Sequence, residues 1–178
     1  MIFYPELACQ LKETYPNMKF IVLVRSSIDR AYSHFMMRTR KKAESRSWEL
    51  AVEARLTLFP SAPLTIPQRQ FDRFDYLNGS CILPYIQAWL DVTPADQFLF
   101  IESQRLFTEP EDSIKKVFEF LGVPNVSGLE FPHINKGDYQ SSMSAEMVEK
   151  LQKWFAPHDI ALNKYLIANA PNLIGDFR

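Results

Sequence analysis

The sequence of 178 residues predicts an α/β domain with a parallel sheet. Lys19–Arg25 and Gln97–Ser103 each contain a continuous apolar run without polar alternation, which is typical of a strand that is covered on both faces. Segments with a helical spacing of apolar residues separate and follow the two runs. Hydrophobic residues make up 47% of the chain, which is enough for one core. We therefore expect residues 1–178 to form a single domain.

The first part of the chain is expected to hold a helix at 7–15, the strand at 19–25 and a helix at 28–42. The first helix ends before a turn signal that begins at Pro16. At the start of the second helix, Ser26 and the acidic residue three positions later resemble a capping box. A strand, a tight turn and a helix in this order form the first half of a βαβ unit.

The remaining helices follow from apolar periodicity and from residues that break helices. A long loop with several prolines, 59–79, is of the kind that often binds a ligand or serves as a lid. Pro110 begins a helix that Gly122 ends, because Pro fits the first helical turn and Gly is favoured just after the last. The expected helices of this part are 47–56, 82–90, 110–121 and 145–155.

Charge, cysteines and hydropathy exclude several broad classes of protein. Twenty Lys and Arg against 21 Asp and Glu give a net charge of −1, which argues against a general attraction to nucleic acid or to an anionic membrane. Cys9 and Cys81 lack the spacing of metal ligands. We expect both to be free, buried thiols, and one disulfide between them is the alternative. The three histidines are too scattered for a metal site. No apolar run is long enough to span a bilayer, the first residues do not resemble a signal peptide, and the chain is expected to be cytoplasmic if Met1 is the true start.

The most informative segment is Val24–Phe35, in which Arg25 follows a strand and precedes a helix. The strand delivers Arg25 to the carboxyl edge of the sheet, where open α/β sheets bind ligands. The unpaired N–H groups at the start of the helix favour an anion in the same place, and a guanidinium can hold a phosphate with two hydrogen bonds. Ser33, about two turns into the helix, can add a hydroxyl. The residues alone leave open whether this is an anion site or an ordinary surface Arg followed by an exposed Ser.

The same segment resembles the 3′-phosphate-binding motif of the sulfotransferases that use 3′-phosphoadenosine 5′-phosphosulfate. That motif is a strand, an Arg, a short turn that usually contains Pro, and a Ser eight positions after the Arg. Arg25 and Ser33 keep this spacing, and Asp29–Ser33 has a form that is common in the bacterial and carbohydrate branches of the family. Later segments resemble the family in the same order, at 47–51, 89–90, 97–102, 118–124, 131–135 and 143–166.

This resemblance implies a parallel-sheet fold of the P-loop NTPase kind and a sulfonucleotide donor as co-substrate, with no metal. By the same resemblance, Arg25 and Ser33 hold the 3′-phosphate of the nucleotide. Lys136 and Gly137 occupy about the place of the family's late basic-glycine loop, which closes over the phosphate region. An ordinary turn at these two residues is the alternative, although Gly lets a backbone approach an anion and Lys supplies charge.

The sequence departs from the family pattern at several points, and around Gly79 to Tyr85 it does not cleanly keep the usual Gly-x-Tyr pattern. Ser26 and Ser27 stand where Pro is usual, which is a small change because Ser caps a helix well. Family members also carry an upstream strand and a Lys-x-Gly-Thr-Thr loop that wraps the 5′-phosphosulfate, and nothing in this sequence matches that segment. The family's usual catalytic base would fall at or before Met1. We therefore expect an N-terminally truncated domain and assign no catalytic residue.

Two functions are compatible with these observations. The first is transfer of a sulfuryl group to a hydroxyl or amine of a carbohydrate or small-molecule acceptor, and the second is an inactive relative that binds only the 3′-phosphonucleotide or a protein partner. A nucleotide kinase is disfavoured, because no Gly-rich phosphate loop that ends in Lys-Ser or Lys-Thr is present. The basic run 38–46 is either a solvated helix end or a grip for an acidic glycan or nucleic acid. Phe71, Phe74 and Tyr76 in the long loop either contact an acceptor or hold the loop in place.

Overall fold

The structure, a computed structural model, describes residues 3–65, 74–126, 128–131 and 143–175. The backbone packs as two compact units, each built from separate stretches of the chain. The first unit consists of 1–25, 87–136 and 163–178, and the second of 26–86 and 137–162.

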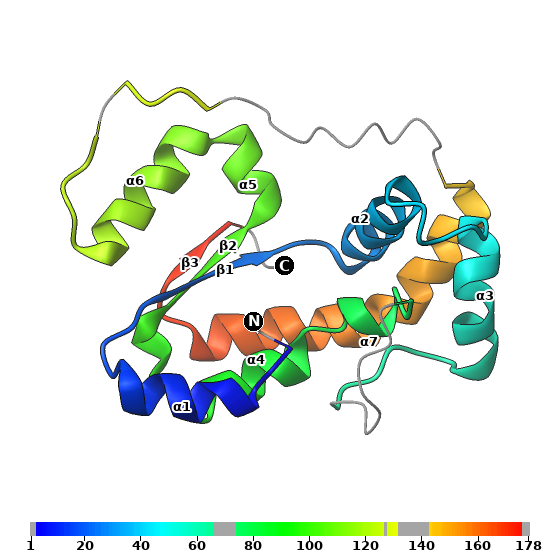
Figure 1. Cartoon of the computed structure of the whole chain (residues 1–178), viewed down its shortest axis with the longest axis horizontal. Helices are drawn as coiled ribbons and strands as arrows, with labels where there is room; N and C mark the ends of the chain where they lie inside the picture. The colour runs from blue at the N-terminus through cyan, green and yellow to red at the C-terminus, as the bar shows by residue number, and fades with distance from the viewer. Residues whose placement is uncertain (1–2, 66–73, 127, 132–142, 176–178) are drawn as a thin grey trace. The chain divides into compact units, whose positions relative to one another are not determined.

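All six predicted helices and both predicted strands are present (Figure 1). In chain order the elements are α1 (Glu6–Thr14), β1 (Phe20–Val24), α2 (Ser27–Arg40), α3 (Trp48–Leu58), the 3-10 turn η1 (Asn78–Ser80), α4 (Leu83–Leu90), the 3-10 turn η2 (Ala95–Gln97), β2 (Phe98–Glu102), α5 (Ser103–Thr108), α6 (Pro110–Leu121), α7 (Ala145–Asn169) and β3 (Leu173–Ile174).

The first unit holds a parallel sheet of three strands in the order β1-β2-β3. β1 and β2 pair along their whole length, from Phe20 opposite Phe98 to Val24 opposite Glu102. The short strand β3 extends the sheet on the other side of β2, with Ile174 opposite Ile101. The predicted α/β class with a parallel sheet is therefore confirmed.

Side chains on one face of this sheet form an aromatic stack. Phe20 lies flat against its neighbour Phe98 at 4.8 Å between ring centroids, and Phe98 continues to Phe100 at 5.8 Å. Trp89 of α4 closes this face with its ring edge-on to Phe20, at 5.4 Å. Aromatic residues of the two predicted strands thus fill one layer of the core.

The opposite face is covered over only part of its width. Leu99 and Ile101 of β2 are 3% and 1% exposed and pack with α5 and α6, which lie on this side of the sheet (Figure 1). Their register partners on β1, Ile21 and Leu23, are 43% and 54% exposed. The prediction of a strand covered on both faces is therefore right for β2 and wrong for β1 among the described residues. The reason is that the apolar side chains of α5 and α6 pack over β2 and β3 and leave β1 open.

The second unit has a core of its own, in which helices pack around aromatic side chains. Trp48 of α3 lies edge-on to Tyr32 of α2 at 5.2 Å and near Phe35 at 5.3 Å. Tyr76 closes the group, 5.5 Å from Phe35. Leu151, Trp154 and Phe155 of α7 complete the cluster.

Local signals placed the helix ends well, with one exception. The Ser26 and Ser47 side chains cap α2 and α3, accepting the N–H groups of Asp29 and Leu50, both at 3.4 Å. The last helix was expected to end at Phe155, but α7 continues through Pro157 to Asn169. Pro inside a helix costs about 3 kcal/mol. The burial of α7 side chains beyond the proline, Leu162 and Leu166 among them, offsets that cost.

The chain turns sharply after β3 at Gly175, whose φ of +123° lies in a region that favours glycine. A Cβ atom built on Gly175 would lie 2.4 Å from the Cβ atom of Glu102, at the end of the neighbouring strand. This close approach leaves no room for a side chain.

The two cysteines are free, and no disulfide joins them. Cys81 is buried in the second unit as predicted, whereas Cys9 is exposed on α1. The expectation of two buried thiols is therefore wrong for Cys9, because this position of a short amphipathic helix faces solvent.

Candidate functional site

The sequence motif begins at the carboxyl edge of the sheet in the first unit. β1 ends at Val24, and Arg25 follows directly and is partly buried. The paired strand β2 ends at the same level, since Val24 lies opposite Glu102. Arg25 therefore occupies the edge at which parallel α/β sheets bind their ligands, as the sequence predicted.

The helix that follows begins two residues later, in the second unit. Ser26 accepts the N–H of Asp29 through its side chain and the N–H of Arg30 through its carbonyl. Among the described residues, the N–H groups of Ser27 and Ile28 have no acceptor. A 14-residue helix with two unsatisfied N–H groups at its start carries a partial positive charge there, which favours an anion.

Two of the four residues predicted for the nucleotide site, Arg25 and Ser33, are described by the structure. Arg25 ends β1 in the first unit, and Ser33 lies in the second turn of α2 in the second unit, partly buried. Lys136 and Gly137 lie outside the described residues. The strand, turn and helix of the motif are thus confirmed, whereas its role in binding stays a prediction.

A polar cluster of Ser27, His158 and Asp159 at the start of α2 was not predicted from the sequence. Ser27, the first residue of α2, donates its hydroxyl hydrogen to Asp159 Oδ1 at 2.5 Å and lies 3.4 Å from His158 Nδ1. His158 Nδ1 is itself 2.9 Å from the same oxygen. On its other side, His158 Nε2 accepts the backbone N–H of Leu83, the first residue of α4, at 3.2 Å. Ser27 and His158 are buried, and the cluster joins segments 131 residues apart.

These residues do not form a hydrolytic triad, although they comprise a Ser, a His and an Asp. In a triad one imidazole nitrogen takes the serine proton and the other donates to the carboxylate. Here the N–H of Leu83 occupies Nε2, so the neutral ring carries its hydrogen on Nδ1 and donates it to Asp159. Both Ser27 and Asp159 face Nδ1, and no nitrogen is left to act as a base on the serine. The cluster is therefore a structural tie.

A second tie holds the next turn of α2. The Arg30 guanidinium donates a hydrogen bond to the Gly79 carbonyl in η1, just before α4. Burial lowers the pKa of Arg30, as expected for a cation removed from water. Arg30 thus fixes α2 to the polypeptide segment that leads into α4.

Several other candidates named in the sequence make contacts within the second unit where they are described. Tyr76 is buried in the aromatic core, and Phe74 lies under the Arg38 guanidinium at 4.7 Å. Both hold the end of the long loop in place, while Phe71 lies outside the described residues. In the basic run, Arg46 pairs with Glu44 at 2.7 Å, and Lys41 is exposed near the end of α2.

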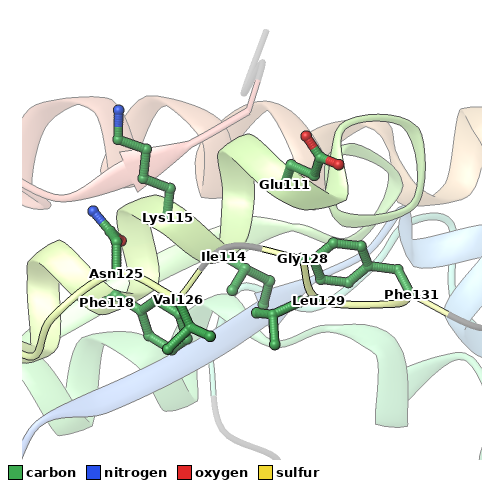
Figure 2. Close-up of a pocket in the computed structure, with 9 residues that line it drawn as sticks. All are labelled: Glu111, Ile114, Lys115, Phe118, Asn125, Val126, Gly128, Leu129 and Phe131. Carbon is green, nitrogen blue, oxygen red and sulfur yellow. The ribbon is translucent and has the colours of Figure 1, made fainter.

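Cavities are present in both units, and neither of the two described here contains a residue of the motif. The first unit has a cavity of about 350 Å³ between α6 and the segment that follows it. Ile114 and Phe118 point toward Val126 and Leu129, whereas Lys115 extends away from them (Figure 2). The second unit has a cavity of about 560 Å³ lined by α3 and the first half of α7.

Metal-binding groups and membrane-spanning helices are both absent from the part of the chain that the structure describes. No group of three or more His, Cys, Asp or Glu there has the arrangement to hold a metal ion. Among the same residues, none of the helices combines the length and the apolar character that crossing a bilayer requires.

The sequence matches one family of known proteins. Residues 8–130 match the family model described as the sulfotransferase domain. The chain is 26% identical, over 93% of its length, to the bifunctional heparan sulfate N-deacetylase/N-sulfotransferase 1 of Caenorhabditis briggsae. It is 28% identical over 62% of its length to the protein of the same name from Xenopus tropicalis. These alignments cover 22% and 12% of the two relatives, so the chain spans less than a quarter of their length.

The fold itself is matched by a solved structure. The sulfotransferase from Alicyclobacillus acidocaldarius superposes with a TM-score of 0.73 and 22% identity, over 93% of this chain and 61% of that one. The three-stranded parallel sheet and its helices thus follow a sulfotransferase fold, as the resemblance of Val24–Phe35 implied. With more than half of its residues matched by the family model, the chain belongs to the sulfotransferase domain family.

Proposed function

We propose that this chain binds 3′-phosphoadenosine 5′-phosphosulfate through its 3′-phosphate, as part of a sulfotransferase that acts on a hydroxyl or amine of a carbohydrate. The observation that carries the proposal is the position of Arg25, at the carboxyl end of β1 and directly before the Ser26-capped start of α2. This segment lies within the residues that match the sulfotransferase domain.

The chemistry of the segment suits a phosphate. The Arg25 guanidinium can donate two parallel hydrogen bonds to phosphate oxygens. The unsatisfied N–H groups of Ser27 and Ile28 can donate to an anion. Ser33, one turn further along α2 than Asp29, supplies a hydroxyl donor. Lys136 and Gly137 are proposed to close over the phosphate region from the later loop.

The transfer reaction breaks the bond between the sulfur and the bridging oxygen of the 5′-phosphate. The acceptor oxygen or nitrogen forms the new bond to sulfur, its proton passes to a base, and adenosine 3′,5′-bisphosphate leaves. In this scheme Arg25 and Ser33 bind and orient the nucleotide at the end remote from the reacting sulfur. They contribute by holding the donor in place rather than by contacting the transferred group.

A carbohydrate acceptor is supported by the names of the relatives. The Caenorhabditis briggsae and Xenopus tropicalis proteins are both described as heparan sulfate N-sulfotransferases, which points to an amine on a glycan. A small hydroxylated molecule is the second acceptor class.

Calorimetric titration with adenosine 3′,5′-bisphosphate and with adenosine 5′-monophosphate tests the nucleotide assignment. We expect the bisphosphate to bind at least about 100-fold more tightly, because charge-assisted hydrogen bonds to the 3′-phosphate contribute about 1.5–3 kcal/mol each. Arg25→Ala should remove most of this preference. Arg40→Ala is the control: it removes an exposed Arg from the C-terminal end of α2 and should leave the preference for the bisphosphate unchanged. If the wild-type chain binds the two nucleotides equally, the proposed function is wrong.

A transfer assay with labelled donor and a desulfated glycan then separates the two functional alternatives. Labelled glycan that depends on Arg25 would establish that the chain is an active enzyme. Tight binding of the bisphosphate without transfer would instead identify a nucleotide-binding relative.

A further inference from the structure

We propose that Ser27, His158 and Asp159 are positioning residues, which fix the first turn of α2 so that its N–H groups and Ser33 can hold the 3′-phosphate of the nucleotide. This inference rests on the proposed function and concerns how the chain achieves it. The three residues touch no nucleotide through their side chains; they act through the backbone of α2.

The first observation is where the Ser27 side chain bonds. Ser27 is the first residue of α2, and its own N–H is one of the two that lack an acceptor among the described residues. Its hydroxyl donates to Oδ1 of Asp159 in α7, at 2.5 Å. Ser27, which offers a backbone N–H to an anion, is therefore fixed through its side chain by a hydrogen bond to α7.

The second observation is that the carboxylate of Asp159 is itself held. Asp159 Oδ1 also accepts from His158 Nδ1 at 2.9 Å, and the fully buried His158 ring cannot turn without losing the Leu83 N–H from Nε2. The start of α4 thus orients the imidazole, and the imidazole orients the carboxylate. A phosphate-binding turn needs such support, because a displacement of about 1 Å can cost about 100-fold in a reaction that depends on orientation.

The third observation is that the hydrogen bond from Ser27 to Asp159 lies at the first turn of α2, the turn whose N–H groups are proposed to bind the phosphate. The Ser27 hydroxyl is not needed to cap α2, because Ser26 already accepts the N–H of Asp29. Nor is it needed to anchor α2 as a whole, since Arg30 bonds to the Gly79 carbonyl one turn later. Ser27 therefore adds a constraint at the first turn alone, where Ser27 and Ile28 offer their N–H groups.

The test compares the dissociation constants of two nucleotides in matched variants of the full chain. The measured quantity is the ratio of the dissociation constant of adenosine 5′-monophosphate to that of adenosine 3′,5′-bisphosphate. This ratio isolates the 3′-phosphate, because both ligands share the rest of the molecule. We expect Ser27→Ala to lower the ratio about tenfold, through weaker binding of the bisphosphate alone.

Asp159→Ala provides a second variant, because it removes the same hydrogen bond from its acceptor side. The Asp159 side chain is 40% exposed, so this change disturbs the packing of the core less than Ser27→Ala does. It should lower the ratio as Ser27→Ala does, and the double variant should lower it no further than either alone. Val52→Ala is the control for a structural effect: it opens a cavity in the core of the same unit and removes none of the hydrogen bonds of Ser27, His158 and Asp159. It should lower the melting temperature and leave the ratio unchanged.

Each outcome has one meaning. A wild-type ratio near one overturns the proposed function itself. A high wild-type ratio that survives both Ser27→Ala and Asp159→Ala leaves the proposed function intact and overturns the positioning role. Equal weakening of both nucleotides in these variants, as from a general loss of structure, also overturns it. Should Ser27→Ala fail to fold, Asp159→Ala alone decides between these outcomes.

Discussion

Tyr76 donates its phenolic hydrogen to the carboxylate of Glu44 at 2.7 Å, inside the core of the second unit. Glu44 is buried and also accepts the Arg46 guanidinium at 2.7 Å and the backbone N–H of Ser45 at 3.0 Å. The hydrogen bond from Arg46 is the main reason that the pKa of Glu44 falls to about 2. Burial, together with the bond to Glu44, raises the pKa of Tyr76. One carboxylate thus ties the basic run to the aromatic core.

Replacing this carboxylate should destabilise the second unit. Glu44→Gln keeps the size of the side chain but leaves a buried amide among donors, so we expect the free energy of unfolding at pH 7 to fall by about 1–3 kcal/mol. Urea denaturation followed by tryptophan fluorescence measures the change, since Trp48 belongs to the same core. Glu13→Gln alters an exposed carboxylate on α1 and should change the stability by less than about 0.5 kcal/mol.

The stability contributed by Glu44 should also depend on pH. A carboxyl whose pKa is lowered on folding stabilises the folded state above its unfolded pKa, near 4.5, and this contribution is lost as the pH falls through about 2. The difference between wild type and Glu44→Gln should therefore shrink between pH 5 and pH 2. Urea curves at several pH values in this window test the prediction, and a constant difference would contradict it.

The two thiols should differ in reactivity. Burial raises the pKa of Cys81, so little thiolate forms there, and the buried sulfur is shielded from reagents. Cys9 is exposed on α1. We expect iodoacetamide to modify Cys9 alone in the folded protein and both residues in urea, as read by mass spectrometry of the peptides. Rapid modification of Cys81 under native conditions would show that its surroundings open readily.

The glycine that ends α6 should resist substitution for a conformational reason. Gly122 has a φ of +74° and donates its N–H to the Phe118 carbonyl at 2.9 Å, so it forms a left-handed cap. Nothing lies within 4 Å of a Cβ atom built there, so only the backbone opposes a side chain. Gly122→Ala should cost about 1 kcal/mol in unfolding free energy. Gly122→Asn should cost less, because Asn tolerates this conformation better.

The open half of the sheet should promote self-association of this chain. Leu23 is 54% exposed on β1, whereas its register partner Ile101 on β2 is 1% exposed. Leu23→Lys should therefore change stability little and increase the fraction of monomer in size-exclusion chromatography with light scattering, because a charge on an exposed strand opposes association. Ile101→Lys places the same charge in the core and should prevent folding. An unchanged oligomer distribution in Leu23→Lys would show that β1 is not the associating surface.

Much of the fold was predictable because its signals are local. A Ser at position 26 or 47 satisfies an N–H three residues later whatever the rest of the chain does, and Gly122 suits the conformation that ends a helix. Elements without such signals were missed. α5 has six residues and no side-chain cap, and β3 has only two residues, so neither carries a periodic pattern.

The arrangement of the candidate site was predictable only in part. The order of β1, Arg25 and α2 follows from the chain itself, so the sequence could show it. The bond from Ser27 to Asp159 joins positions 132 residues apart. The helix that carries Asp159 was expected to have ended before Pro157, and it continues because tertiary burial outweighs the cost of the proline. Contacts of this kind depend on the packed structure and leave no local pattern to read.

Position 175 should tolerate no residue other than glycine. With a φ of +123° and the Glu102 Cβ atom where a side chain would begin, position 175 meets both a conformational and a steric barrier to every other amino acid. In a saturation library the replacements at this codon should be depleted together, whatever their polarity or size. Conservative and radical changes would be equally harmful there, which is the signature of a residue selected for the absence of a side chain.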